Sequence, residues 1–341
     1  MIFETVVSGG CRSYLYGCED TRASVLIDPC LSQLDNYARL IGQHGLRVEH
    51  IVETHTHADH FSAAKKLSAR LGAPIVMHES AASKFANMRL QDGDRLKVGD
   101  LHLDAMHTPG HTADSMCMIA EDRVFTGDTL LIGGTGRTDL PTGDAKALYH
   151  SLFENLLTLP PGLLVLPAHE YRGRSHSTIG DEIANNKRLQ VGSEAEFVEL
   201  MNKLNLSQPT HLTEALRVNV TGGATVSELL SDAALGMVFV SQKQMAQRLS
   251  SGNNEMIVLD VRETTSFEQS HIPGAVNLPR GQIEILVNTM LPDPTQTIVA
   301  YCDCGRISTL AASTLQRLGF TKVCALDGGI NAWRAEGYPT N

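Results

Sequence analysis

Seven side chains of metal-ligand type, each shortly after an apolar run, constrain the fold of this chain more than any other feature. They are His55, His57, Asp59, His60, His111, Asp128 and His169. The apolar runs predict strands over Val48–Val52, Leu101–Met106, Arg123–Thr126 and Leu163–Leu166. Residues placed just past strand ends converge on one edge of a layered sheet. The sequence therefore predicts a metal centre at such an edge, held by imidazole and carboxylate ligands.

Composition and charge narrow the classes of protein to which the chain can belong. Its 341 residues suffice for two domains, and 42% hydrophobic residues suffice for full cores. The formal net charge is −10 and no Lys/Arg cluster is present, so we expect no nucleic-acid partner.

The N-terminal residues and the cysteines indicate the cellular compartment of the protein. The N-terminus lacks the basic and apolar segments of a signal peptide, and no apolar run reaches the ~20 residues of a membrane span, so we expect no membrane association. The seven cysteines are odd in number and scattered, which disfavours a disulfide framework. We interpret the chain as cytoplasmic.

The pattern of elements changes near residues 233–240, which predicts two domains, 1–235 and 238–341. In the first, strands with helices over Phe61–Leu71 and Lys146–Leu157 are followed by helical segments that we expect to cover the sheet and close the domain. Those segments are Glu182–Leu189, Ala195–Leu204 and Val226–Asp232. From Ser241, a helix ended by Ser251–Asn254 is followed by alternating strands and helices, as in a parallel α/β sheet.

The run His-x-His-x-Asp-His at 55–60, with the three later ligands, resembles the metallo-β-lactamase superfamily signature. Within that superfamily, the segments 126–139 and 167–173 are similar to the persulfide dioxygenases, and Gly-Arg-Thr-Asp at 136–139 separates them from glyoxalase II. The resemblance covers about residues 1–205. It implies an αββα sandwich for the first domain.

The same resemblance implies one Fe(II) per chain, held by His55, His111 and Asp128, a set of two imidazoles and a carboxylate that suits Fe(II) oxygenases. The other four residues would then be second-site groups or hydrogen-bond partners of the ligands: His57, Asp59, His60 and His169. A site with two zinc ions stays open, because every ligand of that version is present.

Two further residues are expected to contact substrate. Arg137 matches the family position that binds a carboxylate of glutathione, and a guanidinium suits bidentate carboxylate binding. Its alternative is an ion pair with Asp139. Tyr171, just past the last ligand, is expected to face the substrate pocket.

A second motif, Cys302-Asp-Cys-Gly-Arg306-Ile-Ser308, lies between a predicted strand and helix. Backbone N–H groups of such a loop, the helix N-terminus and Arg306 would stabilise a thiolate or persulfide on Cys302. With the segments 260–263, 271–279 and 326–333, this motif resembles a single-domain rhodanese over 238–341, which implies an α/β domain with a central parallel sheet and Cys302 as the nucleophile. Cys304 is either incidental or pairs transiently with Cys302, and Cys11 is expected to be structural.

Together the two resemblances predict a fusion of a persulfide dioxygenase and a rhodanese that acts in sulfide detoxification. The first site would oxidise glutathione persulfide with O₂ to sulfite and glutathione. The second would move sulfur between thiosulfate, glutathione and persulfide. A zinc thioester hydrolase of glyoxalase II type fused to a sulfurtransferase is the alternative, and formation of a homo-oligomer stays open.

Overall fold

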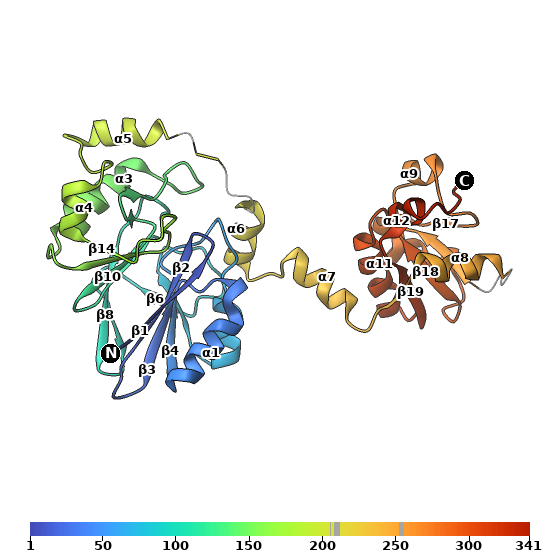
Figure 1. The fold of residues 1–341 in the computed structure, drawn as a ribbon, viewed down its shortest axis with the longest axis horizontal. Helices are drawn as coiled ribbons and strands as arrows, with labels where there is room; N and C mark the ends of the chain where they lie inside the picture. Colours follow the sequence, from blue (N-terminus) through green and yellow to red (C-terminus); the bar gives the residue numbers. More distant parts are fainter. Residues whose placement is uncertain (205, 208–211, 252–255) are drawn as a thin grey trace. The chain divides into compact units, whose positions relative to one another are not determined.

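The structure is a computed structural model that describes residues 1–204, 206–207, 212–251 and 256–341. The chain forms two compact units, Met1–Gly223 and Ala224–Asn341, coloured blue to yellow and yellow to red in Figure 1. Among the described residues, every helix is too short or too polar to cross a lipid bilayer.

The first unit contains two six-stranded sheets that pack face to face. The first sheet has the strand order β1-β2-β3-β4-β5-β6, antiparallel from β1 to β3 and parallel from β3 to β6. Its strands are β1 (Ile2–Ser8), β2 (Cys11–Gly17), β3 (Ala23–Ile27), β4 (Arg47–Val52), β5 (Ile75–His78) and β6 (Met88–Leu90).

The second sheet has the order β14-β13-β10-β9-β8-β7, in which only β10 and β13 are parallel neighbours. Its strands are β7 (Arg95–Val98), β8 (Leu101–His107), β9 (Met116–Ile119), β10 (Arg123–Gly127), β13 (Leu164–Pro167) and β14 (Ser177–Thr178). A short hairpin, β11 (Leu130–Leu131) and β12 (Gly134–Thr135), follows β10.

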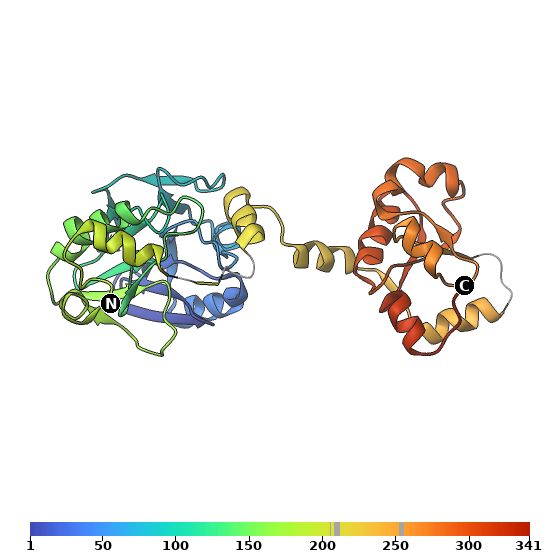
Figure 2. The same ribbon diagram turned by 90° about the horizontal axis from the view of Figure 1, so that it is seen from above.

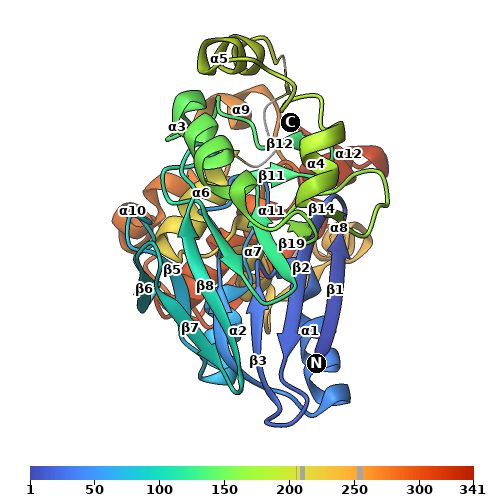
Figure 3. The same cartoon turned by 90° about the vertical axis from the view of Figure 1, so that its left-hand side faces the viewer.

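Three apolar cores separate four layers in this unit. The core between the sheets includes Val25, Phe125 and Leu166. A second core, with Tyr37 and Leu67, joins the first sheet to the helices α1 (Leu34–His44) and α2 (Ala64–Leu71). A third joins the other sheet to α3 (Ala145–His150), α4 (Ile179–Asn185) and α5 (Glu194–Asn202). In Figure 3 the first pair of helices lies at the bottom of the unit and the other three at the top. The predicted αββα sandwich is confirmed.

The four predicted ligand-bearing strands are confirmed as β4, β8, β10 and β13. The helix expected over Lys146–Leu157 is α3, capped by the Asp144 carboxylate, followed by a π-helical turn (Ser151–Asn155) and a 3₁₀ turn (Leu156–Thr158). The helix expected from Phe61 begins at Ala64. A further helix, α6 (Leu212–Thr221), closes the unit, and its Asn219 side chain donates to the backbone carbonyls of His57 and His60 at 2.9 and 2.8 Å.

The second unit contains a five-stranded sheet, all of it parallel, in the order β15-β19-β18-β16-β17. Its strands are β15 (Val238–Val240), β16 (Met256–Asp260), β17 (Val276–Asn277), β18 (Thr297–Tyr301) and β19 (Lys322–Leu326). Helices pack on both faces of the sheet, as Figure 2 shows, so the predicted α/β domain with a central parallel sheet is confirmed. They are α8 (Gln242–Ser250), α10 (Ile283–Met290), α11 (Arg306–Arg317) and α12 (Gly329–Ala335), whereas the short helix α9 (Thr264–Gln269) has no buried residue. Ser241 caps α8, and the expected break at Ser251–Asn254 lies largely outside the described residues.

The division between the units falls earlier than the sequence indicated. The helix α7 (Val226–Ala234), which we expected to cover the sheet of the first domain and close that domain, packs against α11 of the second unit. The spacing of its apolar residues shows that the helix has an apolar face. It does not show whether that face packs in the first unit or in the second. The functional domain bounds, 1–235 and 238–341, stay predictions.

Candidate metal centre

The seven predicted residues lie where strand ends of the two sheets meet. The segment His55–His60 follows β4 of the first sheet, whereas Asp128 and His169 follow the parallel strands β10 and β13 of the second. His111 lies in the loop between β8 and β9. The structure brings these residues together in three adjoining groups, two of which include residues that the sequence did not indicate.

A close approach between the sheets places Asp128. Gly127, the last residue of β10, has φ 51°, and a Cβ at this position would lie 2.6 Å from the Thr54 hydroxyl oxygen. Only glycine adopts this backbone conformation freely and leaves that space. The end of β10 therefore reaches the loop after β4, which brings the Asp128 carboxylate to the histidines.

The first group consists of His55, His111 and Asp128, and all three side chains are buried. Their ligand atoms all lie within 4.8 Å of one another. The two imidazole rings are 5.0 Å apart between centroids, and His111 Nε2 lies 3.6 Å from Asp128 Oδ2. Three donor atoms at this separation are close enough to bind one metal ion.

Hydrogen bonds turn the Nε2 atoms of both histidines toward this group. His111 Nδ1 donates to the backbone carbonyl of Arg137 at 2.8 Å. The Thr54 hydroxyl donates to Asp28 Oδ2 at 2.8 Å, so its oxygen accepts from His55 Nδ1 at 3.0 Å. His55 Nε2 is buried and has no hydrogen-bond partner among the described residues. A buried nitrogen with a free lone pair costs free energy unless a metal binds it, so these residues fit a metal ion.

The charges of the group suit a cation as well. Burial, together with His57 and His111, holds the pKa of His55 well below its usual value, so its imidazole is neutral and able to ligate. Burial alone would raise the pKa of Asp128, but the neighbouring His169 lowers it below the usual range. The carboxylate is therefore ionised.

We expect the Thr54→Val variant, which removes the hydroxyl between Asp28 and His55 without changing side-chain shape, to weaken metal binding by about 10- to 100-fold. Competition with a chelator measures this affinity. Thr108→Val is the matched control, because it removes a buried hydroxyl that instead contacts Thr129 at 2.9 Å. Equal affinities of the two variants would show that the Thr54 hydroxyl does not orient His55.

His57 belongs to a separate buried group with Asp28 and Glu53. Its Nε2 lies 3.2 Å from Asp28 Oδ1 and 3.1 Å from Glu53 Oε2. Burial opposes the charged imidazole, but the two carboxylates raise the pKa of His57 well above its usual value. His57 is thus engaged as a cation by these two carboxylates, with its ring 4.1 Å from that of His55 between centroids.

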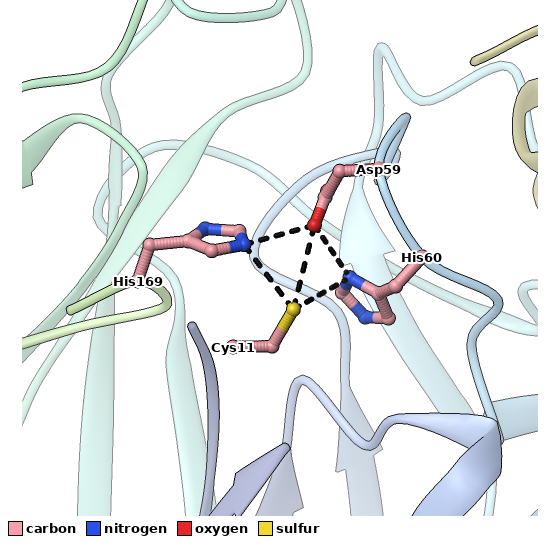
Figure 4. Close-up of side chains that lie close together, drawn as sticks. All are labelled: Cys11, Asp59, His60 and His169. Carbon is pink, nitrogen blue, oxygen red and sulfur yellow. Dashed lines mark hydrogen bonds and ion pairs between the residues drawn. The ribbon is translucent and has the colours of Figure 1, made fainter. Parts of the chain in front are cut away.

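The third group, shown in Figure 4, contains Asp59, His60 and His169 together with Cys11. Asp59 Oδ2 lies 2.9 Å from His169 Nε2 and 3.2 Å from His60 Nδ1. The other ring nitrogen of His169, Nδ1, lies 2.7 Å from Asp128 Oδ1, so the two carboxylate oxygens of Asp128 face different groups.

Cys11, which we expected to be structural, takes part in this third group. Its Sγ lies 3.3 Å from His169 Nε2, 3.4 Å from Asp59 Oδ2 and 3.7 Å from His60 Nδ1. Burial alone would raise the pKa of Cys11, but hydrogen bonds with His169 and His60 lower it below its usual value. The sequence did not indicate that Cys11 belongs to this group, and its role stays a prediction.

One cavity of about 560 Å³ reaches the first and third groups. His111 and Asp128 of the first group and Asp59 and His169 of the third lie in its wall. Its wall also carries four arginines: Arg137, Arg172, Arg174 and Arg188. Three of these guanidinium groups already have a partner in the chain: Arg137 pairs with Asp139, Arg174 pairs with Glu170, and Arg188 donates to the Thr135 carbonyl. An anionic molecule that reaches the metal centre would share or displace these partners.

Both residues predicted to contact substrate line this cavity. The Arg137 guanidinium forms a bidentate ion pair with Asp139, both N–O distances being 2.6 Å, and donates to the Ser207 carbonyl at 2.7 Å. Tyr171 is 76% exposed, and its ring stacks on His169 with centroids 5.9 Å apart. The side chains of Arg137 and Tyr171 therefore both lie at the cavity, and the Arg137 guanidinium is ion-paired with Asp139.

In the second unit, Cys302 follows β18 at the base of the predicted loop and is only 1% exposed. Its Sγ accepts a hydrogen bond from the backbone N–H of Ser308 at 3.4 Å. The start of α12 packs under the loop, where Ile330 N donates to the Cys302 carbonyl at 2.9 Å. Arg306, at the first position of α11, is exposed.

Sequence reasoning missed Cys11, Asp28, Glu53 and Thr54 as members of the site. Asp28 follows β3 as the predicted ligands follow their strands, so its position after an apolar run was an available signal. Cys11 gave no such signal, because it stands at the start of β2 and meets His169 through an isolated bridge between distant segments.

Two family models match the chain. The metallo-β-lactamase superfamily model matches residues 7–169, and the rhodanese-like domain model matches residues 241–336. The human protein described as mitochondrial persulfide dioxygenase ETHE1 is 40% identical over 214 residues, which are 62% of this chain and 84% of that protein.

Two solved structures of the same superfamily also align with this chain. The crystal structure of ETHE1 from Myxococcus xanthus aligns with 66% of this chain and all of its own, at 40% identity and a TM-score of 0.64. A metallo-β-lactamase from Staphylococcus aureus aligns with 96% of this chain and 98% of its own, at 25% identity and a TM-score of 0.62.

Proposed function

Since the chain belongs to the persulfide dioxygenase family of the metallo-β-lactamase superfamily and carries a C-terminal rhodanese domain, we propose that it oxidises glutathione persulfide with O₂ and transfers sulfur through Cys302. The family implies an enzyme with a metal site. The identity of the metal, the substrate and the coupling of the two activities are parts of the proposal.

The observation that carries the proposal is the three-donor group of His55, His111 and Asp128. Two imidazoles and one carboxylate form the set that suits mononuclear Fe(II) oxygenases, because it leaves positions open for O₂ and substrate. We therefore assign one Fe(II) per chain to this group. The His57 cation and its two carboxylates would hold the loop that carries His55.

The wall of the cavity supports an anionic, thiol-bearing substrate. Glutathione carries two carboxylates, and the four arginines offer guanidinium groups to them within a volume of about 560 Å³. Arg137 would bind one carboxylate. Because its guanidinium is paired with Asp139, binding requires that substrate share or displace this partner.

The net reaction is GSSH + O₂ + H₂O → GSH + SO₃²⁻ + 2 H⁺, in which the terminal sulfur is oxidised and O₂ is reduced. Bound iron would supply O₂ activation next to the persulfide sulfur. The residues of this chain hold the reactants: His55, His111 and Asp128 bind the metal, and the arginines orient the glutathione moiety.

The second activity would be transfer of sulfane sulfur between thiosulfate, glutathione and persulfide. The Cys302 thiolate would attack the sulfane sulfur of thiosulfate, break its S–S bond with release of sulfite, and carry the sulfur as a persulfide, stabilised by backbone N–H groups such as that of Ser308. Run in one direction, this reaction supplies persulfide to the metal site. Run in the other, it combines persulfide sulfur with sulfite to form thiosulfate. Fusion raises the local concentration of a labile intermediate.

Oxygen consumption by the full-length chain tests the proposed oxygenase. Glutathione persulfide should cause O₂ uptake with sulfite formed in equal amount, and S-lactoylglutathione should not be hydrolysed. Thioester hydrolysis without O₂ uptake would instead support the alternative, a glyoxalase II-like hydrolase with two zinc ions bridged by Asp128.

We expect the Gly10→Ala variant to raise the KM for glutathione persulfide with little change in kcat. A Cβ on Gly10 would overlap the Tyr171 ring, which would have to leave its stacked position on His169 beside the cavity. Loss of an aromatic contact of ~1 kcal/mol corresponds to about a fivefold change in KM. Tyr171→Ala should give the same increase, and the double variant should give no more. An unchanged KM in both single variants would exclude Tyr171 from substrate binding.

A further inference from the structure

A cavity of about 240 Å³, which we call the α6 cavity, adjoins the large cavity at the metal centre. Its wall comes from the loop after β4, the segment after β5, the loop between β8 and β9, the segment after β12 and the helix α6. Ala58 and Leu140 line both cavities, so the two spaces meet at these side chains. Thr112, which directly follows His111 in the sequence, also lines the α6 cavity. The α6 cavity therefore ends beside the metal centre.

The wall of the α6 cavity is mostly apolar and carries no arginine or lysine. The large cavity, in contrast, has four arginines in its wall. On α6, Leu216 and Val220 lie one helical turn apart and line the α6 cavity together. The apolar side chains of the wall are those of Ala58, Ala82, Ala113, Leu140, Pro141, Leu216 and Val220. Such a wall offers no counter-charge to the anionic groups of glutathione.

The polar side chains of the same wall already have hydrogen-bond partners within the chain. The Asp114 carboxylate accepts from the Thr56 hydroxyl at 2.6 Å, and the Thr112 hydroxyl lies 2.8 Å from the hydroxyl of Ser115. The other two belong to Ser80, which donates to the Ala113 carbonyl at 3.1 Å, and Thr142, which accepts from the Ala113 N–H at 3.3 Å. A small apolar molecule can therefore enter without leaving one of these groups unpaired.

The α6 cavity runs from the surface to the interior. Ala82, Ala113 and Pro141 are exposed, whereas Ala58 and Leu140 are only 5% and 8% exposed. One end is thus open to solvent, and the other end is closed off from the large cavity by the side chains of Ala58 and Leu140. This arrangement gives a small molecule a second way to the metal centre, separate from the cavity that carries the arginines.

We propose that the α6 cavity binds O₂ and conducts it to the metal centre, a role that rests on the proposed persulfide oxidation. O₂ is small and apolar, and small apolar molecules enter apolar cavities that hold water poorly. The glutathione moiety would occupy the large cavity beside its arginines, on the path to the same metal. A separate apolar passage lets O₂ arrive while the persulfide is bound.

Xenon tests the α6 cavity without metal, persulfide or turnover, because xenon binds in apolar cavities of ~150 Å³ or more. Crystals of the full-length chain under xenon pressure should hold a xenon atom among Leu140, Leu216 and Val220. In Leu216→Trp, whose indole would fill this space, the xenon atom should be absent. An α6 cavity without xenon in the wild-type chain would overturn the proposal, even if the chain takes up O₂ with glutathione persulfide.

The dependence of O₂ uptake on O₂ concentration tests conduction. Leu216→Trp and Ala82→Trp fill the cavity from two sides, and each should raise the KM for O₂ by about fivefold or more. The KM for glutathione persulfide and the kcat at saturating O₂ should stay unchanged, which general damage to the fold would not allow. Thr213→Trp, at an exposed position of α6 outside the cavity wall, is the matched control and should keep the wild-type KM for O₂.

The outcomes separate this proposal from the proposed oxygenase. Normal O₂ uptake with an unchanged KM for O₂ in both Leu216→Trp and Ala82→Trp would overturn only the role of the α6 cavity. Absence of O₂ uptake from an iron-loaded wild-type chain whose α6 cavity binds xenon would overturn the oxygenase and, with it, the conduction of O₂.

Discussion

The Asp128→Asn variant is expected to reduce persulfide-dependent O₂ uptake by more than about 100-fold. Removal of a residue that only orients a metal ligand causes a smaller loss. Asparagine keeps the shape of the side chain and an acceptor for His169 Nδ1, which lies 2.7 Å from Oδ1. It lacks the negative charge and the anionic Oδ2 that faces His111 at 3.6 Å. Iron content and O₂ uptake of the purified variant measure the effect.

Two comparisons make this prediction specific. Asp122→Asn, in the turn before β10, removes a half-exposed carboxylate that pairs with Arg123 and should keep both iron and O₂ uptake. Sulfur transfer from thiosulfate to glutathione should be unchanged in Asp128→Asn, because Cys302 lies in the other unit. If Asp128→Asn retains iron and most of the O₂ uptake, Asp128 is not a ligand.

The second large effect is expected at Cys302. Replacement by serine should reduce sulfur transfer from thiosulfate to glutathione by more than about 1000-fold, since removal of a covalent nucleophile leaves only binding and the surrounding dipoles. O₂ uptake with glutathione persulfide supplied directly should be unchanged. A coupled assay of sulfur transfer, alongside an oxygen electrode, separates these two results.

The chain offers matched thiol controls for this variant. Cys324→Ser, on β19 of the same unit, should keep sulfur transfer. Cys304→Ser distinguishes the two interpretations of the exposed Cys304: retained transfer means that it is incidental, and lost transfer means that it pairs with Cys302. Full sulfur transfer in Cys302→Ser would contradict the assignment of the nucleophile.

The elements that carry the predicted ligands could be recognised from sequence because each is a local signal. An apolar run followed by glycine, aspartate or histidine marked the ends of β4, β10 and β13, and strand ends of a layered fold meet at one edge. The Asp144 and Ser241 caps of α3 and α8 were local as well.

What depends on contacts between distant segments could not be predicted. Cys11 meets His169 only because β2 and the segment after β13 lie side by side, which no local pattern indicates. The division of seven ligand-type residues into three groups likewise depends on Asp28 and Glu53, which bind the His57 imidazole although its ring lies 4.1 Å from that of His55. The packing of α7 on α11 is a third case, since an amphipathic helix shows that it has an apolar face and not which core covers it.

The most direct test of the proposed oxygenase is the metal content of the full-length chain purified without oxygen, measured together with O₂ uptake on glutathione persulfide. We expect about one iron per chain, removed by Asp128→Asn, and O₂ uptake in proportion to iron. Two zinc ions per chain, with no iron and no O₂ uptake, would contradict the assignment of His55, His111 and Asp128 to an Fe(II) oxygenase.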